Sequence, residues 1–493
     1  MKPSSARYAS KLTPLALLGE THIAVTLFSF LAGCLALWFY ITADHFPIGR
    51  AHIWGMLVVL WVINLTPFFA DHMEQKFDPF DIKYPFLIYY FFVFTLHSTC
   101  RILWGGGSDD LIVNPNTSDP VRLRALCSMV VGLAAFVCGS YSAIARLLGK
   151  SGPLLRTPPG ERVLLLAIGG LVGGGLALSV LLRKSGGVLS FFENLSSWRT
   201  TGVLEGVGHL TFPIATVMPA SALLLFLASI RPAPAKIKGW GTLSIGICFL
   251  TILPVAILGF RVGVVIVLIQ IAVGWHYSRK KIGAARLGLL GIILLCLLSG
   301  YAAARHKITN ERDAGSPVIQ AVIFRVPGLD TVERVLWRLD QGEPHKGIAS
   351  VATEAATIVG PRVLWPNKPQ PTSLAFADIF FFDYFLGRGD QLHSVRSGIS
   401  PTLIGELLWI GGIPSVAGGA LLLGIVAGAL RSWRERRGPP ILRNWLYALA
   451  LVPFAMFVEA PQNTLNGFVL LGLYCASTVF ILVIRSPLDR MKC

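Results

Sequence analysis

Residues 359–412 read VGPRVLWPNKPQPTSLAFADIFFFDYFLGRGDQLHSVRSGISPTLIGELLWIGG and close the one long polar segment of an otherwise hydrophobic chain. The sequence before Ala304 and after Ile413 consists mainly of apolar runs, whereas residues 305–401 carry 11 basic and 10 acidic side chains. We therefore divide the chain into transmembrane helices at 1–304, a polar loop at 305–401 and further transmembrane helices at 402–493.

The composition is that of an integral membrane protein. Of the 493 residues, 54% are hydrophobic and only 14% are charged, whereas soluble proteins carry about 25% charged residues. Apolar runs of about 20 residues, long enough to cross a bilayer as a helix, recur along the chain. The first run begins near His22, has no small-residue cleavage pattern of a signal peptide, and is long enough to be the first span. We predict an all-α polytopic fold with twelve transmembrane helices, at about 22–42, 51–70, 84–103, 124–145, 162–182, 208–230, 240–260, 262–278, 284–304, 402–430, 442–460 and 466–485.

Basic residues are distributed unequally between the two sides of the predicted membrane. With both termini in the cytoplasm, 24 of the 43 Lys and Arg residues fall in cytoplasmic segments, 11 fall in the long loop and 8 remain for the other outer segments. Basic residues in short loops mark the cytoplasmic side, and long loops are exempt from this rule. The long loop is therefore predicted to be extracytoplasmic, and the net charge of +17 requires no nucleic acid as a partner.

The stretch 240–278 is too long for one crossing, and we divide it at GFRVG, residues 259–263. The two glycines of this motif permit a tight turn, and basic residues flank the whole stretch on one side. This division places Arg261 at the outer membrane surface, on the side of the long loop. An arginine that extends from a helix end toward water remains the alternative interpretation.

Two short amphipathic helices are predicted within the long loop. Leu329, Val332, Leu336 and other apolar residues up to Leu339 recur at helical spacing. Residues 348–359 form the second such pattern. Both helices could lie on the membrane surface.

The next part of the loop, residues 361–371, is rich in proline, which prevents a regular helix. A stiff, extended segment would hold Arg362 and Lys368 in fixed positions. Arginine predominates among the basic residues of the loop, and its forked guanidinium suits recognition of phosphate oxygens.

Residues 376–385 contain six aromatic rings. Two functions are open for this segment. The rings could anchor the chain at the membrane interface, or they could form a surface that stacks on sugars or contacts a prenyl chain.

An outward-facing site with several arginines at the level of the lipid headgroups suits a lipid-linked pyrophosphate. Its head group needs cations, and its tail needs a groove between helices. Transfer of a sugar from it needs a base near the acceptor hydroxyl, for which His393, Glu406 and Asp378 are candidates. His393 lies between Arg388 and Arg396, which would lower its pKa and keep it neutral.

Carboxylates in apolar runs are costly and are functional candidates by default. Glu406 lies just inside the tenth predicted span, and Glu459 lies near the outer end of the eleventh. Either could instead serve only as the ionic partner of an arginine.

Several motifs together resemble the Wzy-type oligosaccharide repeat-unit polymerases of bacterial O-antigen and exopolysaccharide synthesis. They are Pro361-Arg362, Trp365-Pro366, Lys368-Pro369, Ser400-Pro401-Thr402 and Gly405-Glu406, with a turn at Gly411-Gly412. FDPFDIKYP (77–85), GGVLSFFENLSSWR (186–199) and GFRVG also resemble recurring features of that family.

The resemblance implies a GT-C-like enzyme of the bacterial inner membrane that needs neither a metal nor another cofactor. It would transfer a growing glycan from undecaprenyl pyrophosphate to the next lipid-linked repeat unit at the periplasmic face. The resemblance implies roles for Arg261, Arg362, Lys368 and Glu406, and next for Arg199 and Arg325. With the loop residues considered above, we predict Glu406, His393 and Arg362 as catalytic residues. We predict that the substrate pyrophosphate binds Arg261, Arg362, Lys368, Arg199, Arg325 and Arg396. The bilayer is a further partner, and a regulator of chain length is one that the resemblance allows.

Other classes of protein remain open. An O-antigen ligase or another GT-C-like transferase would share the arginines and the late loop. Asp109-Asp110 in an outer segment could serve a metal-dependent sugar transferase, although a solvated turn is the simpler interpretation. Twelve spans also suit a secondary transporter or a flippase of lipid-linked sugars, but the two halves of the chain show no internal repeat.

Overall fold

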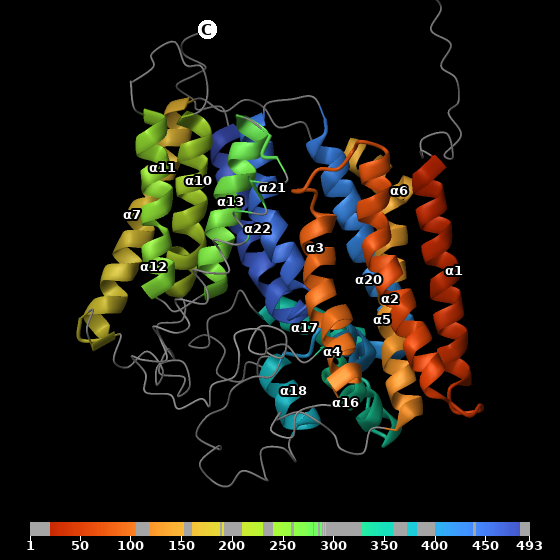
Figure 1. Ribbon diagram of the computed structural model, residues 1–493. Helices are drawn as coiled ribbons and strands as arrows, with labels where there is room; N and C mark the ends of the chain where they lie inside the picture. The colour runs from red at the N-terminus through yellow and green to blue at the C-terminus, as the bar shows by residue number, and fades with distance from the viewer. Residues whose placement is uncertain are drawn as a thin grey trace, which may run out of the picture. The chain divides into compact units, whose positions relative to one another are not determined.

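The structure, a computed structural model, describes residues 20–104, 118–151, 160–187, 190–191, 210–229, 240–257, 261–279, 281–283, 286–287, 289, 291, 328–357, 372–381, 400–436 and 440–483. Every element within these residues is a helix (Figure 1), which confirms the all-α prediction for this part of the chain.

Six of the described helices are long and apolar enough to cross a membrane. They are Thr21–Thr42, Arg50–Met73, Lys83–Leu103, Asp119–Tyr141, Gly160–Lys184 and Leu403–Arg434. Shorter apolar helices occupy Pro213–Ser229, Thr242–Val255, Gly263–Ser278, Ile441–Met456 and Gly467–Leu482. Together these helices coincide with every predicted span except 284–304, most of which lies outside the described residues.

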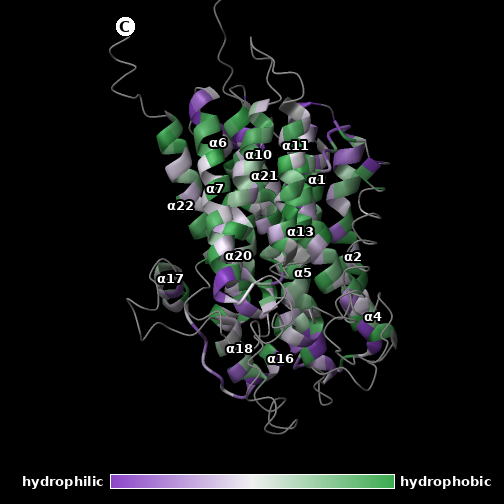
Figure 2. Ribbon diagram, turned by 90° about the vertical axis from the view of Figure 1, so that its left-hand side faces the viewer, coloured by the Kyte–Doolittle hydropathy of each residue, from purple (hydrophilic) through white to green (hydrophobic). Residues whose placement is uncertain are grey.

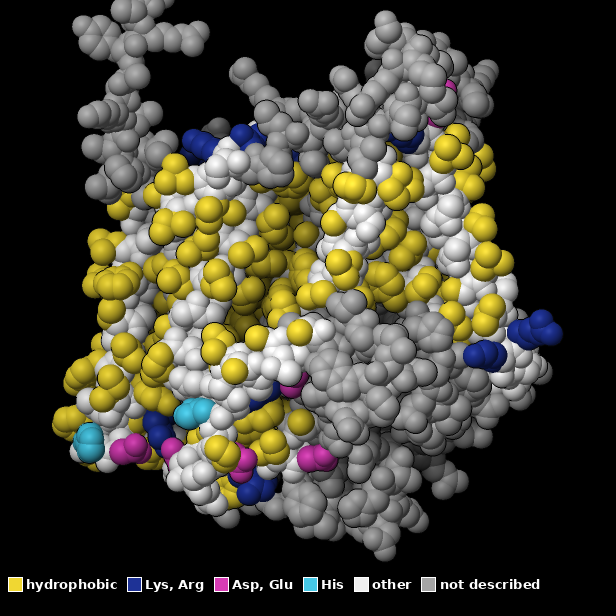
Figure 3. All heavy atoms as spheres, turned by 180° about the vertical axis from the view of Figure 1, so that it is seen from behind, with side chains coloured by type: hydrophobic (Ala, Val, Ile, Leu, Met, Phe, Trp, Pro, Cys, Tyr) yellow, Lys and Arg dark blue, Asp and Glu magenta, His cyan; other side chains and the backbone are white. Residues whose placement is uncertain are grey.

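The outer faces of the long helices are hydrophobic. Phe30, Leu31 and Trp38 of the first helix are each more than half exposed. Figure 3 shows hydrophobic side chains spread over the helices on one face of the molecule, with charged side chains gathered near helix ends. Colouring by hydropathy gives the same picture, since the long helices are mainly hydrophobic along their length (Figure 2). Such faces are stable against lipid and not against water.

The helices fall into two compact units. The first unit contains α1 (Glu20–Thr42), α2 (Arg50–Met73), α5 (Asp119–Tyr141), α6 (Ala143–Ser151) and the part of α20 (Leu403–Arg434) that begins at Gly412. Helix α5 is its centre because it packs against both α1 and α2. Leu126, Leu133 and Val137 of α5 are completely buried.

In the first unit, α20 approaches α5 so closely that side chains are excluded between them. A Cβ atom added at Gly424 would lie 2.1 Å from the carbonyl oxygen of Phe136, and one added at Gly428 would lie 2.4 Å from that of Ser140. Small residues four positions apart let membrane helices approach at the level of the backbone. The α5–α20 contact therefore depends on glycine at these two positions.

Replacing Gly424 by alanine should lower the melting temperature of the purified protein in detergent. The added Cβ would meet a backbone carbonyl, which cannot turn aside as a side chain can, so we expect the cost of overpacking, about 1–3 kcal/mol, to outweigh the gain of about 1 kcal/mol that alanine has over glycine inside a helix. Gly418→Ala in the same helix is the control, because nothing lies within 4 Å of its added Cβ. Equal melting temperatures for the two variants would contradict the close approach.

The second unit contains the other described helices and the first part of α20. They are α3 (Lys83–Tyr90), η2 (Phe91–Leu96), α4 (His97–Trp104), α7 (Gly160–Lys184), η4 (Pro213–Val217), α10 (Met218–Ser229), α11 (Trp240–Leu250), α12 (Ile252–Ile257), α13 (Arg261–Ser278), α16 (Gly328–Asp340), α17 (Ile348–Thr357), α18 (Thr372–Phe380), α21 (Pro440–Met456) and α22 (Pro461–Val483).

Helix α21 connects the elements of this unit. The buried indole N–H of Trp445 donates to the carbonyl of Ala220 in α10 (2.7 Å). The hydroxyl of Tyr447 donates to the carbonyl of Phe80 (2.9 Å) and accepts from the N–H of Ile82 (2.8 Å), just before α3. These bonds satisfy polar groups away from water and set the position of α21 against α3 and α10.

The predicted division at GFRVG agrees with the helix boundaries. Helix α12 ends at Ile257, α13 begins at Arg261, and the two helices pack against each other. This arrangement is expected of two helices joined by a short connection.

Both amphipathic helices predicted in the polar loop are present, as α16 and α17. The apolar stripe of α16 packs within the protein, because Val332, Val335 and Leu336 are buried and the helix packs against α4 and α18. Helix α17 is more open, and Ile348 at its start is 80% exposed.

The aromatic segment contributes to the protein core. Phe376, Phe380 and Phe381 are fully buried. The rings of Phe376 and Phe380 lie 5.8 and 5.3 Å from the ring of Trp409, centroid to centroid. For these three rings, neither interfacial anchoring nor contact with a sugar or prenyl chain is correct. Residues 382–385, which hold the other three rings, lie outside the described residues.

Candidate functional site

Of the residues named above as catalytic or pyrophosphate-binding, Glu406 is the one whose side chain the structure describes, and the further candidate base Asp378 is also described. Arg261 is the first residue of α13, where only the backbone is described. The other candidates lie outside the described residues: Arg199, Arg325, Arg362, Lys368, His393 and Arg396. Asp109 and Asp110 lie outside them as well, and Asp378 is exposed on α18.

Glu406 is buried in the first turn of α20, with 2% of its surface exposed. Its Oε2 accepts a hydrogen bond from the backbone N–H of Gln462 (3.2 Å), in the first turn of α22. A helix N-terminus favours a negative charge, since its first N–H groups lack partners within the helix. Glu406 therefore joins the starts of two membrane helices.

Lys346 supplies the cationic partner of Glu406. Its Nζ lies 3.8 Å from Oε1 of Glu406, 2.9 Å from Oε2 of Glu354 and 3.1 Å from Oγ1 of Thr372. The Thr372 hydroxyl in turn donates to Glu354 (2.5 Å), and Lys346 lies over the ring of Trp409. We call these groups, with the N–H of Gln462, the Glu406 cluster. One ammonium faces two carboxylates, so the cluster has one excess negative charge when both are ionised.

The backbone of α20 is irregular just after this cluster. Gly412 has a φ of 69°, a left-handed conformation that glycine adopts most readily. Pro414 lies two residues further on, inside the helix. The turn expected at Gly411-Gly412 is thus a distortion within α20, and the helix continues beyond it.

The polar loop satisfies the backbone of α20 next to this distortion. The N–H of Lys346 donates to the carbonyl of Trp409 (2.8 Å), and that of Gly347 donates to the carbonyl of Ile410 (3.1 Å). In a regular helix the carbonyl of Ile410 would accept from residue 414, but Pro414 has no N–H. The loop thus supplies a donor that α20 lacks, and this places Lys346 beside Glu406.

A second carboxylate, Glu459, lies in the connection between α21 and α22. The hydroxyl of Tyr89 donates to its Oε2, and its backbone carbonyl accepts from the Ser400 hydroxyl and from the N–H of Thr402 (3.1 Å). Glu459 is partly exposed. The chain just before α20 is therefore attached to the α21–α22 connection, and Tyr89 of α3 joins them.

A third polar contact holds α16 to α4. Asp330 pairs with Arg101 (3.0 Å) and lies 3.8 Å from Nε2 of His97. The Nδ1 of His97 accepts from the N–H of Leu329 at the start of α16 (3.4 Å). These contacts fix the first helix of the polar loop to a helix predicted to lie in the membrane.

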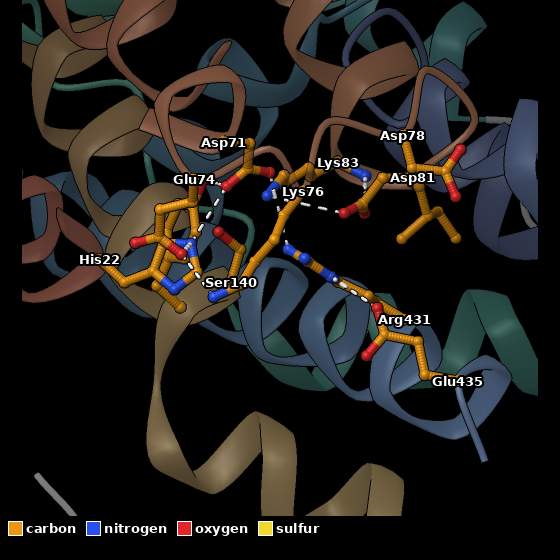
Figure 4. Close-up of polar contacts among 12 residues, drawn as sticks. His22, Asp71, Glu74, Lys76, Asp78, Asp81, Lys83, Ser140, Arg431 and Glu435 are labelled. Carbon is orange, nitrogen blue, oxygen red and sulfur yellow. Dashed lines mark hydrogen bonds and ion pairs between the residues drawn. The ribbon is translucent and has the colours of Figure 1, made fainter. Parts of the chain in front are cut away.

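The first unit contains a separate charged network centred on Asp71, which is completely buried near the end of α2 (Figure 4). Its Oδ1 is 3.2 Å from Nε2 of His22 in α1 and accepts from the hydroxyl of Tyr141 in α5 (3.1 Å). Its Oδ2 is 3.7 Å from Arg431 in α20. One carboxylate thus gathers three neighbouring helices around α2.

The His22 ring also connects this network to α6. The guanidinium of Arg146 lies 3.2 Å from Nδ1 of His22. Because arginine only donates, Nδ1 must accept, and the ring proton is on Nε2, facing Asp71. Burial, reinforced by the charge of Arg431, lowers the pKa of Arg146, and the carboxylates of Glu435 and Glu74 partly offset this effect.

Sequence reasoning missed Lys346, Tyr89 and His22. Lys346 is one of three lysines in the polar loop, and no local pattern pairs it with Glu406. Tyr89 lies in the aromatic run YYFFVF, where a tyrosine that bonds a carboxylate looks like one that fills a core. His22 and Asp71 lie at the ends of different spans, and only their opposite chemistry could have suggested a pair.

Comparisons with protein-family models, with curated proteins and with solved structures found no match for this chain. The described helices define its class by themselves. It is an α-helical, multi-pass membrane protein in which a polar loop folds onto membrane-length helices.

Replacing Lys346 by methionine should destabilise the protein strongly. Removing one partner of a buried ion pair costs about 3–5 kcal/mol, since the remaining charges stay buried. Lys346→Met is expected to lower the melting temperature in detergent, and adding Glu406→Gln should restore part of the loss. Lys76→Met is the control, because the Lys76 side chain is 52% exposed and surface pairs contribute about 0–1 kcal/mol. A Lys346→Met protein as stable as the control would contradict this account of the cluster.

The Asp71 network can be tested in the same way. Asp71→Asn removes the charge that faces Arg431 and should destabilise the protein by about 3–5 kcal/mol. Asp119→Asn, at the start of α5, is the control, since that side chain is 49% exposed. Thermal unfolding that is equal in the two variants would show that Asp71 does not hold the helices together.

Proposed function

We propose that this protein polymerises lipid-linked oligosaccharide repeat units at the periplasmic face of a bacterial inner membrane. The attachment of the polar loop to the first turn of α20, through the Glu406 cluster, is the observation that carries the proposal. In this cluster the polar loop contributes Lys346, Glu354 and Thr372 to a charged centre at the first turn of a membrane-length helix. A lipid-linked pyrophosphate needs such a position, because its tail lies among membrane helices while its head group lies at their ends.

The proposed reaction makes modest demands on the protein. A pyrophosphate is already a good leaving group, so no strong general acid is required. Preorganised cations stabilise the charge that develops on it, and a base accepts the proton of the attacking hydroxyl. The proposed pyrophosphate-binding residues are Arg261, Arg362, Lys368, Arg199, Arg325 and Arg396. Glu406 and His393 are the bases that the sequence proposes.

The contacts at Glu459 and Asp330 support the same location for the substrate head group, at the ends of the membrane helices. Both attach parts of the polar loop, or the residues that follow it, to helices predicted to lie in the membrane. Groups contributed from the loop would therefore act beside groups contributed from the helices. An O-antigen ligase would use the same arrangement with a different acceptor, and glycan analysis separates the two.

A strain lacking this protein should accumulate single repeat units on the lipid carrier. Wild-type protein should restore long glycans, and Arg362→Ala should not, because the pyrophosphate would lose a forked cationic partner. Gel analysis of glycan length, with carrier-linked sugars identified by mass spectrometry, measures this. Arg279→Ala, at a basic position between the predicted spans 262–278 and 284–304 and on their cytoplasmic side, is the matched control and should restore polymer.

Three other results would redirect the proposal. Long glycans that form on the carrier but are not attached to their final acceptor would identify a ligase. Movement of lipid-linked sugars across vesicles without a change in glycan length would identify a transporter or flippase. Loss of polymerisation on chelation would favour a metal-dependent transferase. Unchanged glycan length in the deletion strain would end the polymerase hypothesis.

A further inference from the structure

We infer that Glu459, positioned by Tyr89, is the base that takes the proton from the acceptor hydroxyl, and that Glu406 holds the site together. This inference rests on the proposed function and names a catalytic residue for it. The two carboxylates differ in their surroundings.

Glu406 has no direction from which a substrate could reach it in this conformation. It is 2% exposed, with Lys346 at one oxygen and the N–H of Gln462 at the other. Lys346 is itself held by Glu354 and Thr372. A base must come within about 2.6–3.2 Å of the hydroxyl proton donor, so a substrate would have to dismantle the cluster first.

Glu459 has the opposite surroundings. It is partly exposed, and within the described part of the chain no Lys, Arg or His side chain pairs with it. Tyr89 donates to one carboxylate oxygen, and the other receives no donor from the described residues. The pair therefore presents one oriented carboxylate oxygen that can accept a proton.

The position of Glu459 also agrees with this role. Its backbone carbonyl is bonded by Ser400 and Thr402, which end the polar loop and precede α20. Thr402 also contacts Glu406, because the N–H of Glu406 donates to the carbonyl of Thr402 (2.9 Å). The buried Glu406 cluster thus stabilises the segment that carries the contacts of Glu459.

The proposed step conserves atoms and charge. The acceptor hydroxyl oxygen bonds to the anomeric carbon of the donor glycan as the bond from that carbon to the pyrophosphate oxygen breaks. The electron pair of the broken bond leaves with undecaprenyl pyrophosphate. The hydroxyl proton passes to the free carboxylate oxygen of Glu459 and later to water. Tyr89 stays protonated and keeps the carboxylate oriented.

The test measures kcat and KM of the full-length protein in lipid nanodiscs, with single lipid-linked repeat units extracted from the deletion strain as substrate. Glu459→Gln keeps an acceptor for Tyr89 but cannot take the proton, so kcat should fall by about 100-fold or more, with KM and melting temperature unchanged. Glu459→Asp should retain more activity than Glu459→Gln. Tyr89→Phe should lower kcat by about tenfold without raising KM, the signature of a group that acts on the chemical step.

Two variants complete the comparison. Glu406→Gln should lower the melting temperature, which separates the holding role from the catalytic one. Glu161→Gln, at an exposed carboxylate in the first turn of α7, should match the wild type in every measurement. If wild-type protein polymerises and Glu459→Gln does so with an unchanged kcat, the assignment of Glu459 is overturned and the proposed function stands. A fall in melting temperature equal to that of Glu406→Gln would also overturn it, and wild-type protein that makes no polymer would instead overturn the proposed function.

Discussion

The satisfaction of backbone hydrogen bonds around the distortion of α20 is the constraint on which the candidate site depends. Lipid offers no partners for backbone groups, so a membrane helix interrupted by proline must find a donor within the protein. Gly347 provides that donor to the carbonyl of Ile410. Because the donor comes from the polar loop, the loop must return to this one position on the helix. Lys346 precedes Gly347 and is thereby carried to Glu406.

The two carboxylates near the start of α20 show how surroundings assign roles to one residue type. Glu406 is enclosed by a lysine, a helix N-terminus and further polar groups, which makes it a connection between elements. Glu459 has a single tyrosine donor and partial access. A buried ion pair is weak support for stability but strongly restricts where its partners can lie. Chemistry requires access, and Glu459 alone of the two has it.

In the first unit, too, a buried carboxylate connects several helices. Asp71 gathers His22, Tyr141 and Arg431 from three helices, and its partners are themselves bonded. Glycines bring α5 and α20 together at the level of the backbone, so a few polar and small residues determine the packing of otherwise interchangeable apolar helices. We regard this network as structural, because each of its groups already has partners.

The sequence by itself determined the class of the fold, the positions of most helices and the two amphipathic helices of the polar loop. These features follow from hydrophobic length and periodicity, which act between residues close in the chain. Only the tertiary structure decided that the aromatic rings of α18 pack on Trp409, that the partner of Glu406 is Lys346, and that Tyr89 meets Glu459. The candidate site could be predicted only in part, since Glu406 was identified by its cost in a membrane but its neighbours were not. Contacts between residues far apart in the chain depend on which surfaces fit together, and local sequence patterns do not determine that fit.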